Sequence, residues 1–171
     1  GTSLAEINAV LTERQQMIAC EPPQLSHDLV NHSSGNDADA DTGTLGGAVA
    51  CGLSGPGRPW LGAMRDAVLG VELINGEGEY LKFGGQVMKN VAGYDVSRLQ
   101  AGAWGGLGVM SVISLRVQPR FATEQTVHGE MSASQALALC AKLGVRNLPI
   151  TGTAWIGGQL HIRLAGNDSG L

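Results

Sequence analysis

Apolar side chains recur with helical spacing in the first segment of the chain. They are Leu4, Ile7, Val10 and Leu11. Ser3 stands just before this run and Glu6 lies three residues after Ser3, which is the spacing of a capping box. The pattern predicts an amphipathic helix that begins near residue 4 and ends near residues 14 to 16. The apolar residues 17–20 then predict a short buried strand.

Strand-like alternation marks the middle of the chain. Leu69, Val71 and Leu73 alternate with Gly70 and Glu72. The turn sequence at 75–78 follows, and residues 80–83 form the returning arm of a predicted hairpin. A helix is expected at 94–99, and the apolar positions of 109–117 predict the clearest strand.

The last fifty residues have the pattern of a separate unit. We expect a strand around Val127, a helix over 132–142 and a hairpin formed by 154–156 and 159–164. The fold class expected is α+β, with a mainly antiparallel sheet flanked by helices. The domains expected are 1–122 and 123–171.

Composition narrows the class of function. Glycine accounts for 26 of 171 residues, about twice the usual share of ~7%. The formal net charge is -4 and no basic run occurs, which argues against nucleic-acid binding. No apolar stretch is long enough for a membrane span. Three widely spaced cysteines suit a reducing compartment, so a cytoplasmic protein is expected.

The polar segment 24–43 is expected to be a loop. Asp37, Asp39 and Asp41 within it have the spacing of calcium ligands, but Thr42 and Ala48 stand where an EF-hand needs Gly and Glu. A solvated loop is the better interpretation. No spacing of Cys and His predicts a zinc site, so no metal is expected.

A first glycine cluster stands at a predicted helix start. Its residues are Thr44, Leu45, Gly46 and Gly47. Free backbone N–H groups at a helix N-terminus stabilise an anion such as a pyrophosphate, and glycines allow it to approach closely. Taken alone, a Thr-capped helix with glycines that serve packing explains the pattern at least as well.

Two more clusters follow along the chain. The second comprises Gly52, Leu53, Ser54 and Gly55 and runs on to Gly62, Arg65 and Asp66. Such small residues can lie flat against a planar ring system, although Arg65 and Asp66 could equally form a structural ion pair. The third comprises Gly105, Gly106, Leu107, Gly108 and Val109 at the entry to the clearest strand, where glycines imply close backbone contact. None of the clusters has the Rossmann or P-loop pattern.

The order of the three clusters resembles the FAD-binding domain of the vanillyl-alcohol oxidase and p-cresol methylhydroxylase (PCMH) superfamily. The similarity extends from Thr44 to Val117, and the runs 52–56 and 83–99 resemble the FAD-binding subunits of bacterial glycolate oxidases. Glu21-Pro22-Pro23 fits the same group. The third cluster departs from the usual Gly-Ser-x-Gly-Thr-Leu-Gly, since Ala103 and Gly106 lack the hydroxyl groups.

The resemblance implies FAD as the cofactor. It implies that residues 44–47 face the pyrophosphate, that 52–55 and 62–66 lie near the isoalloxazine, and that 105–109 line the nucleotide. Flavin oxidation of a 2-hydroxy acid also needs a base and a cation for the carboxylate. Arg58 and Arg65 are candidates for the cation, but the catalytic base is unknown, since His128 and His161 fit better as structural strand residues.

Two functions remain open after these considerations. The chain is either the flavin-binding part of a complex that oxidises glycolate to glyoxylate, or an assembly subunit that keeps the fold without catalysis. Another D-2-hydroxy-acid dehydrogenase of the superfamily is the further alternative. The resemblance implies flavin-bearing and iron-sulfur partner subunits, and with them a peripheral position at the inner membrane. We also expect that the first FAD subdomain and the rest of the C-terminal domain are missing, and that the exposed apolar surface favours self-association.

Overall fold

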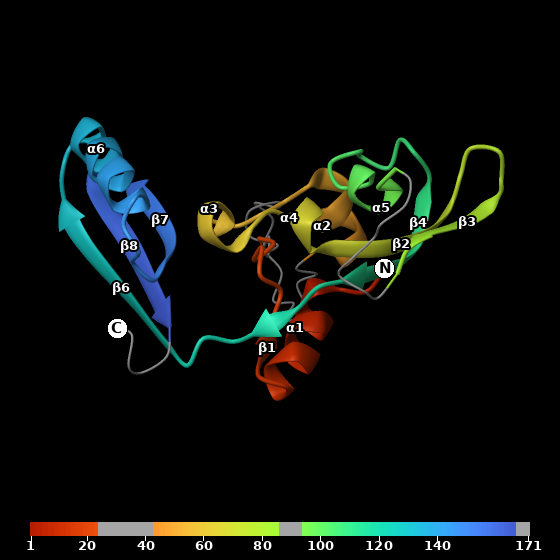
Figure 1. Ribbon diagram of the computed structural model, residues 1–171, viewed down its shortest axis with the longest axis horizontal. Coiled ribbons are helices and arrows are strands. Elements are labelled where there is room, and N and C mark those ends of the chain that lie inside the picture. Colours follow the sequence, from red (N-terminus) through yellow and green to blue (C-terminus); the bar gives the residue numbers. More distant parts are fainter. Residues whose placement is uncertain (24–42, 86–93, 167–171) are drawn as a thin grey trace, which may run out of the picture. The chain divides into compact units, whose positions relative to one another are not determined.

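The computed structural model of the chain describes residues 1–23, 43–85 and 94–166 (Figure 1). Contacts divide the chain into two compact units. The first is Gly1–Gly55 with Gly62–Pro119, and the second is Pro56–Leu61 with Arg120–Leu171. The chain therefore enters the second unit briefly at Pro56–Leu61 and again after Pro119, while the family-based boundary after residue 122 stays a prediction.

The first unit combines short helices with antiparallel strands. Its helices are α1 (Leu4–Glu13), α2 (Leu45–Cys51), α4 (Met64–Ala67) and α5 (Val96–Leu99). Its strands are β1 (Gln16–Met17), β2 (Val68–Ile74), β3 (Tyr80–Gly84), β4 (Val109–Leu115) and β5 (Gln118–Pro119). A three-stranded sheet has the order β3-β2-β4, and β1 pairs with β5. These elements confirm the expected α+β class.

The core of the first unit lies on one face of β2. Val71 and Leu73 point to this face and are both 2% exposed. They belong to one buried cluster with Leu4 of α1, Val49 of α2 and Met64 of α4. Removal of these apolar side chains from water is what stabilises three short helices against the sheet.

Local signals in the sequence explain several element boundaries. Ser3 and Glu6 form the predicted capping box at the start of α1. The predicted hairpin is present as β2 and β3, and the Asn75 side chain closes its turn by accepting the N–H groups of Glu77 and Glu79. The predicted helix at 94–99 is shorter, because Asp95 caps it by accepting the Arg98 N–H at 3.1 Å.

The strand predicted at 17–20 was wrong over most of its length. Only Gln16–Met17 forms a strand, β1. Ile18, Ala19 and Cys20 are buried without strand pairing, so their apolar character reflects burial and not a sheet. The loop expected at 24–43 lies outside the described residues except for Gly43, as do Asp37 to Asp41 and the segment 86–93 of the glycolate-oxidase-like run.

The second unit is a sheet with helices packed on it. It comprises α3 (Arg58–Leu61), α6 (Ala133–Gly144), β6 (Thr123–Glu130), β7 (Ile150–Ile156) and β8 (Gln159–Gly166). The strand order is β6-β8-β7, and all pairs are antiparallel (Figure 1). The predicted helix and hairpin of this region are confirmed, and Val127 lies in β6 as expected.

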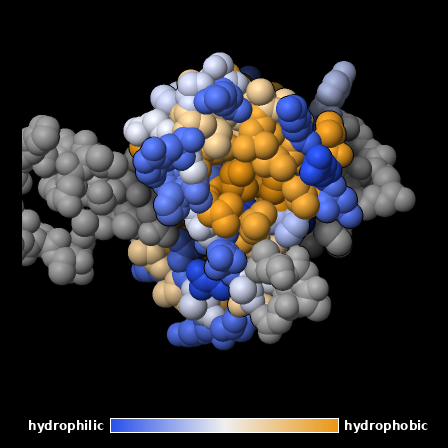
Figure 2. Space-filling model, turned by 90° about the vertical axis from the view of Figure 1, so that its left-hand side faces the viewer, coloured by the Kyte–Doolittle hydropathy of each residue, from blue (hydrophilic) through white to orange (hydrophobic). Residues whose placement is uncertain are grey.

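The helix α6 begins at a capping box formed by Ser132 and Gln135. Ala136 is its buried residue, and the Trp155 indole N–H of β7 donates to the Met131 carbonyl oxygen at 3.0 Å just before the helix. Figure 2 shows apolar side chains gathered on one face of this unit, with hydrophilic residues around them. Leu137 is among its exposed apolar residues.

Candidate functional site

Helix α2 connects the first and third glycine clusters. At its start, Thr44 is the N-cap residue, and its Oγ1 accepts the Gly47 N–H at 3.1 Å. The Leu45 N–H donates to the carbonyl oxygen of Thr2 at 3.1 Å. Among the described residues, the Gly46 N–H has no acceptor. In the first turn, the Gly46 N–H is therefore available as a donor. The N–H groups of Leu45 and Gly47 are already used within the protein.

The described residues give no packing reason for a glycine at position 46. None of them has an atom within 4 Å of a Cβ atom built at Gly46. Glycine early in a helix costs about 1 kcal/mol of helix stability relative to alanine, so a residue with a side chain would be more stable here. The open space and the free N–H at Gly46 are what an approaching anionic group requires.

Residues of the second cluster cap helices and pack closely in the fold. Gly52 ends α2 in the left-handed conformation with a φ of 66°. Ser54 Oγ accepts the Met64 N–H at 2.9 Å, at the start of α4. A Cβ atom at Gly55 would lie 2.5 Å from the Glu21 carbonyl oxygen. These residues are therefore explained by packing and capping, whether or not a ring system lies against them.

The second half of this cluster surrounds the start of α4. Gly62 has a φ of +90°, and the Asp66 carboxylate accepts the Ala63 N–H at 3.0 Å. Asp66 thus caps the helix, whereas the Arg65 side chain is exposed. Arg58, the other candidate for a substrate carboxylate, is exposed on α3 and belongs to the second unit.

The third cluster is held by the C-terminal end of α2. The Gly102 N–H donates to the Val49 carbonyl oxygen at 3.0 Å, and the Trp104 N–H donates to that of Ala50 at 2.9 Å. A Cβ atom at Gly52 would lie 3.3 Å from the Cα atom of Gly102. Segments about fifty residues apart in sequence therefore meet at one helix end.

The rest of this cluster is open on its outer side. Gly105 has a φ of +74°, and a Cβ atom there meets no described residue within 4 Å. Trp104 and Leu107 expose 77% and 46% of their surface. Gly108 differs, because its Cβ atom would lie 2.5 Å from the Ile74 carbonyl oxygen as the chain enters β4 beside Val109. The Ala103 carbonyl oxygen accepts the Gly106 N–H at 2.9 Å, which closes a tight turn.

The two open regions fit an elongated ligand. Gly46 lies in the first turn of α2, while the loop with Gly105 is bonded to its last turn. A helix of seven residues is about 10 Å long. A ligand that reaches both ends must be longer than a single phosphate group. A dinucleotide such as FAD is long enough to contact both Gly46 and the outer side of the loop.

A separate cavity of about 290 Å³ lies on the sheet of the first unit. It is lined by Gly70, Gly84, Glu72 and Lys82 among other residues. Lys82 Nζ lies 2.6 Å from Glu72 Oε1, and the Tyr80 hydroxyl also donates to Glu72. Hydrogen bonds from Lys82 and Tyr80 hold the pKa of Glu72 below its usual value. The Glu72 carboxylate is therefore already engaged by Lys82 and Tyr80 at this cavity.

The histidines of the second unit lie on neighbouring strands. His128 of β6 and His161 of β8 are direct cross-strand partners, and their ring centroids lie 5.6 Å apart in a stacked arrangement. Within the described ranges, no group of three or more His, Cys, Asp or Glu residues could hold a metal ion. The same part of the chain contains no helix long and apolar enough to cross a membrane.

Comparison with known proteins relates part of this chain to FAD-binding proteins. Residues 24–84 match the FAD binding domain family. The whole chain is 43% identical over 171 residues to the glycolate oxidase subunit GlcE of Escherichia coli, of which it covers 45%. About half of the chain is 33% identical over 84 residues to the glycolate oxidase subunit GlcD of Bacillus subtilis, covering 18% of that protein. A similar stretch of 81 residues is 33% identical to the D-lactate dehydrogenase of Archaeoglobus fulgidus, again covering 18%.

Proposed function

We propose that this chain, which carries part of an FAD binding domain and is similar along its whole length to a glycolate oxidase subunit, contributes FAD-binding residues to an enzyme that oxidises glycolate to glyoxylate. The similarity at 43% identity over the entire chain is the observation that carries the proposal. The chain spans less than half the length of that relative, so the activity and the substrate are inferred for the assembled enzyme.

The proposed roles of the site residues follow the three clusters. Thr44, Leu45, Gly46 and Gly47 would hold the pyrophosphate, with the Gly46 N–H as the free donor. Gly52, Leu53, Ser54, Gly55, Gly62, Arg65 and Asp66 would lie near the isoalloxazine. Gly105, Gly106, Leu107, Gly108 and Val109 would line the nucleotide. When bound, FAD supplies the hydride chemistry, whereas these residues bind and orient the cofactor.

A titration of the chain with FAD, followed by flavin fluorescence, tests the proposal. Gly46→Asp adds a negative charge and a side chain where the pyrophosphate is expected. Asp at a helix N-terminus favours the helix, so the variant should fold, and loss of binding is not explained by unfolding. Gly76→Asp is the matched control, because it adds the same charge in the β2–β3 turn, where a Cβ atom also has open space. Saturable binding that only Gly46→Asp abolishes supports the proposed site, and equal binding by both variants contradicts it.

An assembly subunit without catalysis is the second candidate function. The observation that favours it is that Thr44 Oγ1, Ser54 Oγ and the Leu45 N–H already have partners within the protein. Co-expression of the chain with flavin-bearing and iron-sulfur subunits separates the two functions. An assembly subunit supports formation of the complex even as Gly46→Asp, whereas a flavin-binding subunit loses bound FAD with that substitution.

The substrate and the cellular location are parts of the same proposal. Similarity to D-lactate dehydrogenases makes D-lactate the comparison substrate for assays of the assembled enzyme with glycolate. We propose a cytoplasmic complex that meets the inner membrane through its partner subunits. Exposed apolar residues such as Leu137 and Val145 support self-association of the chain when it is studied alone, which sedimentation measures directly.

A further inference from the structure

The sheet of the second unit has two edges that differ in regularity. β7 forms one edge, and its register with β8 shifts between Ile150 and Gly152. Helix α3 also packs on β7. β6 forms the other edge, and its register with β8 runs from Thr123 to Glu130 without a shift. In the described part of the chain, β6 pairs with no strand other than β8, so its outer edge is regular and open.

β6 lacks most of the features that keep an edge strand from pairing with another chain. Natural edge strands are short, or they carry lysine, proline or a bulge. β6 has eight residues, and it contains no lysine, no proline and no bulge. Residues 124–128 are all exposed. A regular, exposed strand of this length can accept a further strand through its main-chain groups.

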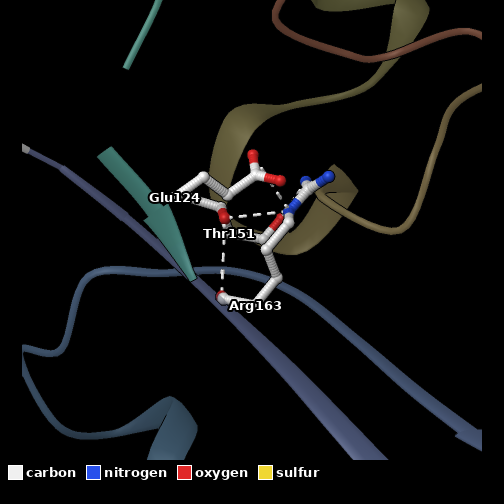
Figure 3. A network of polar contacts seen from close by, with 3 residues as sticks. All are labelled: Glu124, Thr151 and Arg163. Carbon is white, nitrogen blue, oxygen red and sulfur yellow. Dashed lines mark hydrogen bonds and ion pairs between the residues drawn. The ribbon is translucent and has the colours of Figure 1, made fainter. Parts of the chain in front are cut away.

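A row of polar side chains follows one face of β6. Side chains alternate between the faces of a strand, so Glu124, Thr126 and His128 share a face. Figure 3 shows Glu124 reaching toward the guanidinium of Arg163 on β8, and Glu124 Oε2 lies 3.9 Å from Arg163 Nε. The Glu124 side chain is 55% exposed, and a pair this long and this exposed is weak. The Glu124 carboxylate can therefore accept another hydrogen bond.

This row complements a second copy of itself in one antiparallel register. Two copies of β6 related by a two-fold axis perpendicular to the sheet pair antiparallel. With the axis at Thr126, Glu124 of each copy lies opposite His128 of the other, and an imidazole N–H can donate to a carboxylate. With the axis at Val127, Glu124 lies opposite Glu130, and like charges opposite each other are unfavourable. The side chains therefore favour the register centred on Thr126.

We propose that the open edge of β6 binds a second copy of this chain, with the two β6 strands paired antiparallel about Thr126. The two three-stranded sheets then form one continuous sheet. Main-chain hydrogen bonds provide the affinity, and the two pairs of Glu124 with His128 fix the register. The inference does not depend on FAD binding, because the interface consists only of residues of the second unit. It is also distinct from association through exposed Leu137, which lies on α6.

Cysteine cross-linking tests the register of the pairing. Cys51→Ser and Cys140→Ser remove the two partly exposed cysteines, whereas Cys20 is buried and can stay. Thr126→Cys then places the two thiols of the dimer directly opposite each other. Gln125→Cys and Val127→Cys are the matched controls, because each residue lies about 8 Å from its own copy in this register, beyond the reach of a disulfide. Mild oxidation should link only the Thr126→Cys variant, which electrophoresis without reductant detects.

Sedimentation velocity over a range of concentrations tests the charge pairs. Glu124→Lys should weaken the dimer about tenfold, since both pairs are lost at once. Glu130→Lys makes the same change of charge at the end of β6 and should have little effect. Glu124→His combined with His128→Glu exchanges the two groups and should restore the dimer. Circular dichroism confirms that each variant is folded.

Three outcomes overturn the inference. The first is a wild-type chain that stays monomeric at the highest concentration at which it is soluble. The second is cross-linking of Gln125→Cys or Val127→Cys in place of Thr126→Cys. The third is a dimer that Leu137→Gln abolishes while Glu124→Lys leaves it unchanged, because association would then occur through α6. The cross-linking result keeps the inference testable if a charge variant fails to fold.

Discussion

The backbone N–H of Trp104 donates to the carbonyl oxygen of Ala50 at 2.9 Å. This bond fixes the loop before β4 on the last turn of α2, next to the bond from Gly102 to Val49. Carbonyl groups in the last turn of α2 have no partner within the helix, and the N–H groups of the loop donate to them instead. The first and third glycine clusters are therefore parts of one structure, and a change in either should affect the other.

The backbone at Trp104 is strained. Its φ is 55°, a left-handed value that is rare for a bulky residue, and its side chain is 77% exposed. Trp104→Gly should therefore raise the free energy of unfolding by about 1 kcal/mol. Trp104→Ala keeps the strain and should change stability little. Urea denaturation of the three proteins measures the difference, and a less stable Gly variant would show that the exposed indole contributes packing after all.

Gly84 should tolerate no side chain. Its φ is +69°, and a Cβ atom there would clash with the Leu69 carbonyl oxygen and lie 2.6 Å from Ser97 Oγ. We expect Gly84→Ala to destabilise the protein by roughly 2–3 kcal/mol or more, since strain and a clash with backbone combine. Gly76→Ala is the matched control in the adjacent turn, where nothing lies within 4 Å. Thermal unfolding should separate the two variants, and equal midpoints would contradict the geometry.

Ser97 contains a buried hydroxyl group that has no partner in the part of the chain that the structure describes. The residue is 1% exposed, and its Oγ has no hydrogen bond to any described residue. Ser97→Ala removes the desolvation cost of that group and should stabilise the fold by about 1 kcal/mol. Ser97→Val should destabilise it, because the added methyl groups crowd the backbone at Gly84. A destabilising alanine substitution, measured by chemical denaturation, would mean that the hydroxyl is satisfied in solution.

Burial raises the pKa of the Cys20 thiol to about 11. The folded pKa lies above the unfolded one, so its contribution to stability is complete below about pH 8.5 and is lost as the pH rises toward 11. The free energy of unfolding should fall over this range by on the order of 2 kcal/mol through this group. Cys20→Ser, which does not titrate there, provides the reference. If both proteins lose stability equally between pH 8.5 and 11, Cys20 is not responsible.

Periodicity in the sequence predicted the elements whose side chains carry a clear pattern. The alternation around Val71 gave β2 and its hairpin, and the helical spacing after Ser3 gave α1. The short helices α3 and α4 were missed, since four residues are too few for a period to appear. The hydrogen bond between Trp104 and Ala50 was also missed. It joins backbone groups, which every residue type has, so the sequence does not indicate it.

The polar row of β6 was only partly visible in the sequence. His128 was interpreted as a structural histidine, and Glu124 was not singled out. The available signal was the alternation of polar residues, since Glu124, Thr126 and His128 share one face of β6. Whether that row lies at a sheet edge depends on pairing between strands far apart in the sequence, which periodicity within one strand does not reveal.

The strand order β6-β8-β7 has a consequence for the synthesis of the chain. The strand made last lies in the middle of the sheet, and β6 and β7 meet only through it. When β6, α6 and β7 have emerged from the ribosome and β8 has not, the two strands lack the neighbour that joins them. The sheet can close only after Gly166 has emerged, so the second unit should remain open to chaperones and proteases until translation of β8 is complete.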